Sequence, residues 1–310
     1  MNKHALSAAI LGLSGIFMGS VFAQEAKVYL DYTQKQLDHN YSQAEWAPNM
    51  KQMLLRYEYR SALTRQQLGA PQRFSYGSKA VEGLNLFRAS NSKAPVLIYL
   101  HGGAWAGGSA DMYDFPASML LDKGISYIAL DFDNVKTAGL DGMIAQIRSA
   151  IAWVYKNADT LNIDAEKIYL AGHSSGAHLG GVALATDWAS YGVPANVLKG
   201  ATLISGMYDL KPVRLSARSS YVPFTDAIED ALSAQRHLDK INTPVILATG
   251  SLETDEFKRQ SRDFEQALLK SNKPVQRIEV MQFNHFEMMD DYGNPWNPVA
   301  AATLRQILNR

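Results

Sequence analysis

Gly172-His173-Ser174-Ser175-Gly176 lies between an apolar run over residues 167–171 and a stretch of small residues that extends to Ala185. A serine between two glycines, placed where a strand turns into a helix, is typical of a nucleophile elbow. The small neighbours permit a strained backbone turn that pushes the serine hydroxyl out of the fold. The segment therefore predicts that Ser174 is a nucleophile at the end of a buried strand.

Around this segment, short apolar runs alternate with longer segments of helical periodicity. The apolar runs predict strands over residues 95–100, 125–132, 167–171, 198–205, 245–249 and 275–281. Apolar residues at helical spacing predict helices over 142–155 and 257–269. Continuous apolar runs are typical of strands buried on both faces, and their alternation with helices indicates a parallel sheet. With the elbow, the pattern predicts an α/β-hydrolase fold, with a mostly parallel central sheet and helices on both faces.

The first residues have the pattern of a secretory leader. Lys3 precedes an apolar stretch over 5–22, and Val21-Phe22-Ala23 provides the compact residues that a signal peptidase requires before Gln24. We expect residues 1–23 to be a cleaved signal peptide and the mature protein to be periplasmic or secreted. The alternative is an uncleaved anchor, because the stretch is close to the minimum length that spans a bilayer.

Length and composition indicate one enzyme domain over residues 24–310. Residues 207–240, polar and containing Pro212 and Pro223, interrupt the strand–helix rhythm, which predicts a small cap segment over the site. The 30 basic and 30 acidic residues balance, so we expect a small-molecule partner, no nucleic acid and, without the leader, no membrane. The absence of cysteine excludes disulfides and thiolate metal sites. We expect no metal and no cofactor, and no pattern predicts the oligomeric state.

A serine nucleophile needs a base, and in this fold the chain order is serine, acid, histidine. Three histidines follow Ser174, and of these only His285 comes on a loop after a late strand. His178 falls one turn into the helix behind the nucleophile, where we expect a packed core residue. His237 ends the cap segment and is expected at the surface. The order therefore favours His285 as the base.

The acid is expected on the loop after the strand that ends at Gly250. Glu253 lies in that loop, before the next helix, and is the favoured acid. Asp255 is the alternative, although it and Glu256 fall where a helix N-terminus stabilises acidic residues without a catalytic role. Asp209 follows a strand that comes one step too early and is a weaker candidate.

The segment His101-Gly102-Gly103-Ala104-Trp105 ends another predicted strand. Cleavage of an ester or amide places negative charge on the carbonyl oxygen, which backbone N–H groups stabilise when they point at it. The two glycines allow the backbone to approach a substrate closely. We expect the N–H groups of Gly103, Ala104 and Ser175 to form this oxyanion hole.

These segments also resemble the arylformamidase, or kynurenine formamidase, branch of the α/β-hydrolases. Residues 101–105 resemble its HGGxW motif, 172–179 its GHSAGAHL elbow and 256–261 its EFxRQS stretch, and 37–41, 68–71 and 205–210 are also similar to the family. The resemblance spans most of the mature chain. It implies metal-free cleavage of an aryl formamide of the N-formylkynurenine type, or of a small ester, through an acyl-enzyme on Ser174.

The chain departs from the family's pattern in three places. Glu253 stands where the family has aspartate, which leaves Asp255 open as the acid, and Ser175 replaces a small apolar residue while keeping its backbone N–H. The third departure is the leader, because an enzyme of kynurenine breakdown is expected in the cytoplasm. An exported carboxylesterase that acts on acetyl or feruloyl esters is therefore the alternative. A binding module that keeps the fold without its chemistry is the non-enzyme alternative.

Overall fold

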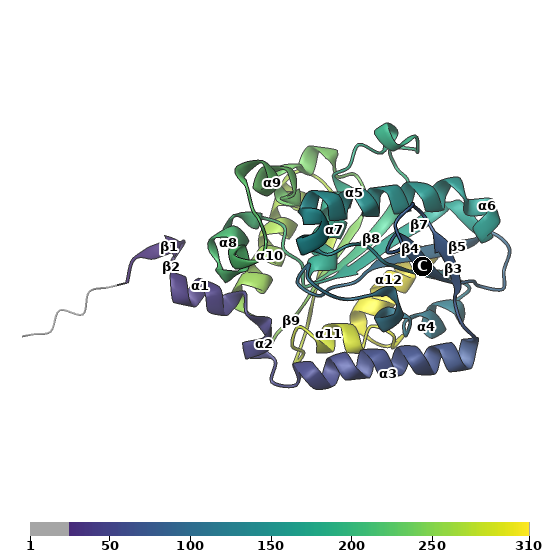
Figure 1. The fold of residues 1–310 in the computed structure, drawn as a ribbon, viewed down its shortest axis with the longest axis horizontal. Helices are drawn as coiled ribbons and strands as arrows, with labels where there is room; N and C mark the ends of the chain where they lie inside the picture. Colours follow the sequence, from purple (N-terminus) through teal and green to yellow (C-terminus); the bar gives the residue numbers. More distant parts are fainter. Residues whose placement is uncertain (1–24, 310) are drawn as a thin grey trace, which may run out of the picture.

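An eight-stranded sheet forms the centre of the computed structural model, which describes residues 25–309 (Figure 1). Its strands lie in the order β10-β9-β8-β7-β5-β6-β4-β3. Strands β5 to β10 run parallel, whereas β4 and β3 add antiparallel pairs at one edge. The bounds are β3 (Gln72–Ser75), β4 (Gly83–Phe87), β5 (Ala94–Leu100), β6 (Ser126–Leu130), β7 (Ile163–His173), β8 (Leu198–Ile204), β9 (Val245–Gly250) and β10 (Val275–Val280). The mostly parallel sheet confirms the predicted fold.

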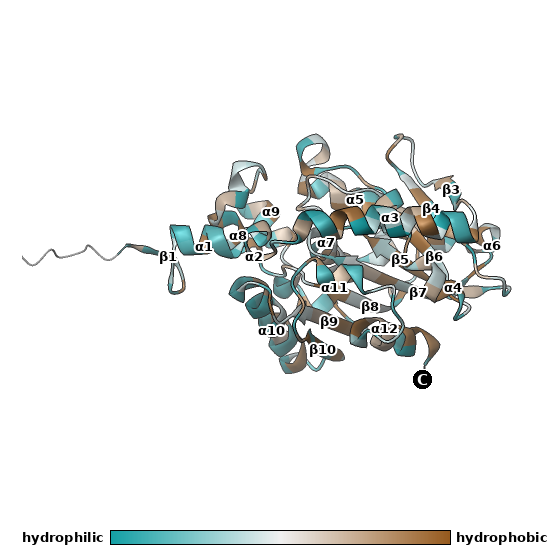
Figure 2. Ribbon diagram, turned by 90° about the horizontal axis from the view of Figure 1, so that it is seen from below, coloured by the Kyte–Doolittle hydropathy of each residue, from teal (hydrophilic) through white to brown (hydrophobic). Residues whose placement is uncertain are grey.

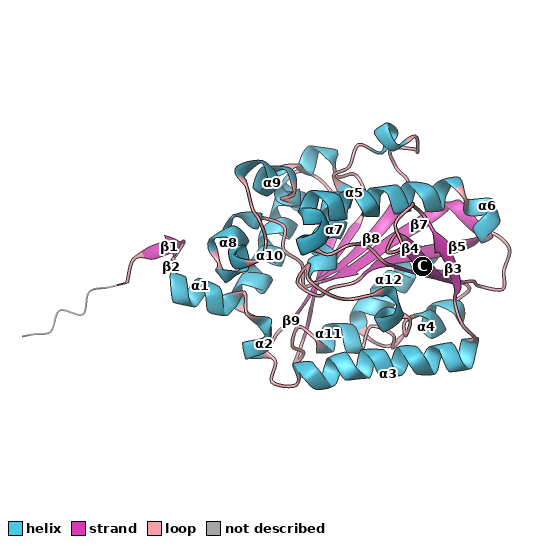
Figure 3. Cartoon of the chain, in the orientation of Figure 1, coloured by secondary structure: helices cyan, strands magenta, loops and turns pink. Residues whose placement is uncertain are grey.

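Helices cover both faces of the sheet (Figure 3). Successive side chains of a strand point to opposite faces, and on β5 Ile98 joins one hydrophobic core while Leu97 and Tyr99 join the other. The first core also contains side chains of α5 (Val135–Lys156), α7 (Ser175–Leu184) and α10 (Asp255–Lys270). The second contains side chains of α3 (Met50–Leu68), α4 (Ala117–Leu121) and α12 (Pro298–Leu308). Figure 2 shows hydrophobic residues along the strands and hydrophilic ones along the outer side of α10.

Shorter elements connect these layers. They are β1 (Lys27–Tyr29), β2 (Tyr32–Thr33), α1 (Gln34–Asn40), α2 (Gln43–Trp46), α6 (Ala158–Leu161) and α11 (Glu287–Asp290), with 3₁₀ turns at η1 (Ala110–Tyr113) and η2 (Trp188–Tyr191). Helices α1 and α2 lie near α8 (Leu210–Leu215), at one end of the sheet (Figure 1). Residues 34–46 therefore lie at the same end of the described structure as the segment expected to form a cap.

All six predicted strands and both predicted helices are confirmed, and the strand ends shift by four residues or fewer. Helix α5 begins earlier than predicted, at Val135, ahead of a kink at Gly139, whose φ is 69°. The sequence did not predict β3, β4 or the helices before them. In α3, Leu55 and Tyr59 are 66% and 68% exposed, so its apolar residues do not keep to one face. Without that periodicity the helix gives no clear signal.

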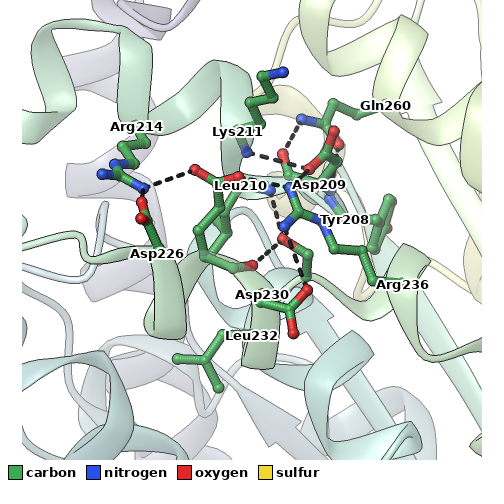
Figure 4. A network of polar contacts seen from close by, with 12 residues as sticks. Tyr208, Asp209, Leu210, Lys211, Arg214, Asp226, Asp230, Leu232, Arg236 and Gln260 are labelled. Atoms are coloured by element: carbon green, nitrogen blue, oxygen red, sulfur yellow. Dashed lines mark hydrogen bonds and ion pairs between the residues drawn. The ribbon is translucent and has the colours of Figure 1, made fainter.

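Residues 207–240 are built from helical turns that polar contacts tie together. The segment contains α8, η3 (Ala217–Ser220), α9 (Asp226–Ala231), η4 (Ala234–Arg236) and η5 (Leu238–Lys240). Arg236 pairs with Asp209 at 3.0 Å and with Glu229 at 2.7 Å (Figure 4). Gln260 of α10 accepts hydrogen bonds from the N–H groups of Tyr208 and Asp209 (Figure 4). The Arg236 ion pairs hold the segment together, and the Gln260 hydrogen bonds join it to α10.

No helix between residues 25 and 309 combines the length and the apolar character that crossing a membrane requires. The predicted signal peptide, residues 1–23, lies outside the described residues.

Candidate active site

Ser174 occupies a strained turn between β7 and α7. Its φ of 56° and ψ of −122° are unfavourable for a residue with a side chain, and its N–H donates to the Ile204 carbonyl at 2.8 Å. A Cβ at Gly176 would collide with the Leu100 carbonyl, so this neighbour has to be glycine. The backbone thus has the geometry of a nucleophile elbow, at the carboxyl ends of the parallel strands, where α/β folds bind ligands.

Glu253 and His285 are in direct contact. His285 Nδ1 lies 2.7 Å from Glu253 Oε2, and both side chains are almost fully buried. Glu253 Oε1 accepts hydrogen bonds from Ser205 Oγ at 2.6 Å and from the Gly250 N–H at 2.7 Å. A carboxylate only accepts hydrogen bonds, so Nδ1 of His285 carries the proton and Nε2 is the basic nitrogen. His285 lines the same pocket as Ser174.

The competing acids lie elsewhere. The Asp255 side chain is 72% exposed and pairs with Lys258 at 3.4 Å in the first turn of α10. Glu256 is buried but pairs with Arg259 at 2.6 Å. Asp209 accepts from the Lys211 N–H at the start of α8 and pairs with Arg236. Only Glu253, of the four carboxylates considered from the sequence, forms a hydrogen bond to His285.

Three other histidines around the elbow are buried. His173 Nε2 lies 2.9 Å from the His285 carbonyl oxygen, and burial holds the His173 pKa well below its usual value. Burial also lowers the pKa of His101, whose ring stacks on Phe132 at a centroid distance of 4.1 Å. His178 accepts from Trp105 Nε1 at 3.1 Å and donates to the Leu232 carbonyl at 2.9 Å. His178 is therefore a hydrogen-bonded core residue, as expected. Its burial lowers its pKa to about 4.

We expect the free energy of unfolding to fall as the pH drops, because buried His178 resists protonation. Its folded pKa of about 4 is below the 6.5 of an exposed histidine, so its contribution is complete above pH 6.5 and is lost toward pH 4. The His178 contribution between pH 7 and pH 5 is about 2 kcal/mol. Glutamine can make both hydrogen bonds without titrating, so His178→Gln should weaken the pH dependence by that amount in urea unfolding. Equal slopes in both proteins would contradict this assignment.

The loop after β5 packs directly against the elbow. A Cβ at Gly102 would lie 3.1 Å from the Ser174 Cβ, and one at Gly103, whose φ is 121°, would collide with the Gly107 carbonyl. Gly103 and Ala104 line the pocket beside Ser174, and within residues 25–309 their N–H groups have no acceptor. The Ser175 N–H begins α7, where the first N–H groups have no intrahelical partner. These three donors are free to bind an oxyanion.

The pocket has a volume of about 450 Å³ and is mostly apolar. Its lining includes Tyr41, Ser42, Gln43, Met50 and Leu54 from the start of the chain, and Ala217, Arg218 and Tyr221 from the segment 207–240. The sequence did not single out the first group or Arg218, although residues 37–41 were part of the family resemblance. Among the aromatic residues of this region, Tyr221 lines the pocket, whereas Tyr208 stacks on Phe264 in the core.

Within the described part of the chain, no three His, Asp or Glu side chains are grouped so that they could hold a metal ion.

The chain is similar to one family model, to curated kynurenine formamidases and to solved structures of esterases. The sequence model of the BD-FAE family matches residues 84–190. The kynurenine formamidase of Danio rerio is 29% identical over 268 residues, which cover 82% of this chain and 90% of the relative. That of Salmo salar is 28% identical, covering 84% and 92%. The crystal structure of an inhibited esterase B from Lactobacillus rhamnosis matches with a TM-score of 0.65 at 17% identity, covering 86% of this chain and 95% of that one. This last likeness concerns the fold alone.

Proposed function

The chain belongs to the arylformamidase- and carboxylesterase-like branch of the α/β-hydrolases, and from this membership we propose that it cleaves a small ester or an aryl formamide through an acyl-enzyme on Ser174. The observation that carries the proposal is the hydrogen bond between His285 Nδ1 and Glu253, in a pocket that Ser174 also lines. A base in the correct tautomer beside a strained serine is what nucleophilic acyl transfer needs.

In the first half of the reaction, Ser174 Oγ attacks the substrate carbonyl and His285 Nε2 takes the hydroxyl proton. The N–H groups of Gly103, Ala104 and Ser175 stabilise the negative oxygen, and one such donor contributes about 3 kcal/mol. The bond to the leaving group then breaks, and His285 returns the proton to the departing oxygen or nitrogen. Glu253 steadies the imidazolium in between.

In the second half, water replaces the leaving group. His285 removes a proton from the water, whose oxygen attacks the acyl-serine, and the acid product leaves as the proton returns to Ser174. An aryl formamide would give formate and an ester its carboxylic acid. The relatives named kynurenine formamidase favour the formamide. The alternative is an exported carboxylesterase acting on acetyl or feruloyl esters, and the predicted leader favours it.

From the predicted leader we also propose that the enzyme works in the periplasm or outside the cell. Its support is the sequence alone, since Val21-Phe22-Ala23 precedes Gln24 in the pattern that a signal peptidase cleaves.

One preparation tests the reaction and the location. The full chain is expressed in a bacterium that has a periplasm, and the mass of the periplasmic protein should correspond to a start at Gln24. Initial rates on N-formylkynurenine and on 4-nitrophenyl acetate then distinguish the formamidase from the esterase, with a metal chelator leaving both rates unchanged. Retention of the leader would contradict export, and no turnover of either substrate would favour the binding-module alternative.

A further inference from the structure

Arg218 is the cationic side chain of the pocket and is unusually buried. It lies in η3, within the segment 207–240, and only 8% of its surface is exposed. It lines the same pocket as Ser174 and His285. Because arginine is always charged in proteins, the structure buries a full positive charge in the pocket that the proposed nucleophile also lines.

The neighbours of Arg218 provide hydrogen-bond acceptors for only some of its N–H groups. Its Nη1 donates to Tyr221 Oη at 3.1 Å and its Nη2 to the Tyr41 carbonyl at 3.0 Å, while its buried Nε has no partner among the described residues. Its Cζ lies 5.6 Å from the centre of the Trp105 ring, which adds a weaker attraction. Two of the five N–H groups of the guanidinium are thus used.

No carboxylate between residues 25 and 309 forms an ion pair with Arg218. Arg259 and Arg277, which are also partly buried, each have one, since Arg259 pairs with Glu256 and Arg277 with Glu265 at 2.8 Å. Arg88 and Arg148 have none among the described residues, but neither lines this pocket. Asp38 also lines the pocket, but its Oδ1 accepts from the Ala217 N–H at 2.6 Å and from Gln34 Nε2 at 2.9 Å. Asp38 keeps its negative charge in the pocket, but no described carboxylate pairs directly with the guanidinium of Arg218.

A buried charge without a counter-charge is costly, and the cost falls when a ligand brings the opposite charge. The apolar lining of the pocket strengthens such a pairing, because water does not screen it. The Nη1 and Nη2 atoms of Arg218 each keep a further N–H group, and a hydrogen bond from a charged guanidinium to a carboxylate is stronger than one to a neutral acceptor. The residues around Arg218 therefore favour a ligand with a carboxylate.

We infer that Arg218 determines specificity by binding a carboxylate of the substrate while Ser174 attacks the ester or formamide carbonyl. This inference rests on the proposed function and adds the chemical class of the substrate, an anionic ester or formamide. Arg218 binds and orients the substrate and takes no part in the proton transfers.

The test compares two matched pairs of esters, which place a carboxylate on either side of the scissile bond. Mono-4-nitrophenyl glutarate and its methyl ester differ in charge on the acyl side, and 4-acetoxybenzoate and its methyl ester differ on the leaving-group side. For each pair, the ratio of kcat/KM for the charged ester to that for the neutral ester is measured. Comparing this ratio between variants cancels the intrinsic reactivity of the esters.

Arg218→Met should lower the ratio by about 10- to 100-fold in at least one pair, because a hydrogen-bonded charge pair is lost. Arg218→Lys keeps the positive charge and should retain part of the ratio. Arg214→Met is the matched control, since Arg214 lies in the same segment, pairs with Asp226 and does not line the pocket. Its ratio should equal that of the wild type. A ratio unchanged by Arg218→Met in both pairs overturns the inference.

If Arg218→Met does not fold, carboxylate binding is tested on the wild type by inhibition. Benzoate should inhibit the hydrolysis of 4-nitrophenyl acetate competitively, and more strongly than the isosteric neutral benzamide by about tenfold. Equal inhibition by the two compounds would count against a carboxylate site. Failure of the proposed function looks different, because the wild type would then hydrolyse neither the esters nor N-formylkynurenine. Turnover without any preference for charge refutes only the role of Arg218.

Discussion

Replacement of Ser174 by alanine is expected to reduce kcat by roughly 10⁴- to 10⁶-fold, because the oxyanion donors and the pocket remain but the attacking oxygen is gone. The fold should survive, since the Ser174 hydroxyl makes no hydrogen bond that supports it within the described residues, and alanine keeps the N–H that donates to Ile204. Initial rates on 4-nitrophenyl acetate measure the loss, and urea unfolding measures the stability of the same preparation.

A fluorophosphonate probe extends this experiment to the covalent step. The wild type should be labelled at Ser174, and Ser174→Ala should not be labelled. Ser190→Ala, in η2 away from the pocket, is the control and should behave as the wild type in both assays. Full activity of Ser174→Ala would refute the acyl-enzyme. A wild-type protein that is neither labelled nor active would instead be a binding module.

Glu253→Gln is expected to lower kcat by about 10³- to 10⁴-fold, because it changes the tautomer of His285. Ser205 and the Gly250 N–H both donate to one oxygen of Glu253, and the glutamine oxygen would have to take that place. Its NH₂ group then faces His285 Nδ1 and requires that nitrogen to accept. The proton of the imidazole moves to Nε2, which can no longer take the proton of Ser174.

Asp255→Asn is the matched comparison for this change. It also removes one carboxylate charge from the same loop region, but that side chain is 72% exposed and pairs only with Lys258. An exposed pair contributes little, so stability should change by less than about 1 kcal/mol and kcat by less than about twofold. Both kcat and the unfolding free energy are measured for the two variants. If Asp255→Asn lost activity and Glu253→Gln kept it, the assignment of the acid would be reversed.

Sequence order was enough to predict that Ser174, Glu253 and His285 lie at the same end of the sheet, where Glu253 contacts His285. Each of Ser174, Glu253 and His285 follows a strand of the parallel sheet, and loops at the carboxyl ends of such strands come together whatever their separation in sequence. The choice between Glu253 and Asp255 depended on where α10 begins. The helix starts at Asp255, so Glu253 stays in the loop and turns inward.

The walls of the pocket were much harder to predict. Helix α3 contributes Met50 and Leu54 to the pocket but exposes Leu55 and Tyr59, so its hydrophobic periodicity is weak. Arg218 lies in a polar segment, where its sequence neighbours give no sign that it is buried. Its burial results from packing against Tyr41 and Trp105, which are more than a hundred residues away in the chain. Such long-range contacts leave no local pattern.

The hydrogen bond from Arg218 to the Tyr41 carbonyl joins two distant parts of the chain in the lining of the pocket. The inferred substrate preference therefore depends on both the segment 207–240 and the residues around α1 and α2. An engineer who transplants only residues 207–240 into a related hydrolase would move the guanidinium without the carbonyl that holds it. Grafts meant to transfer selectivity have to carry residues 37–54 as well.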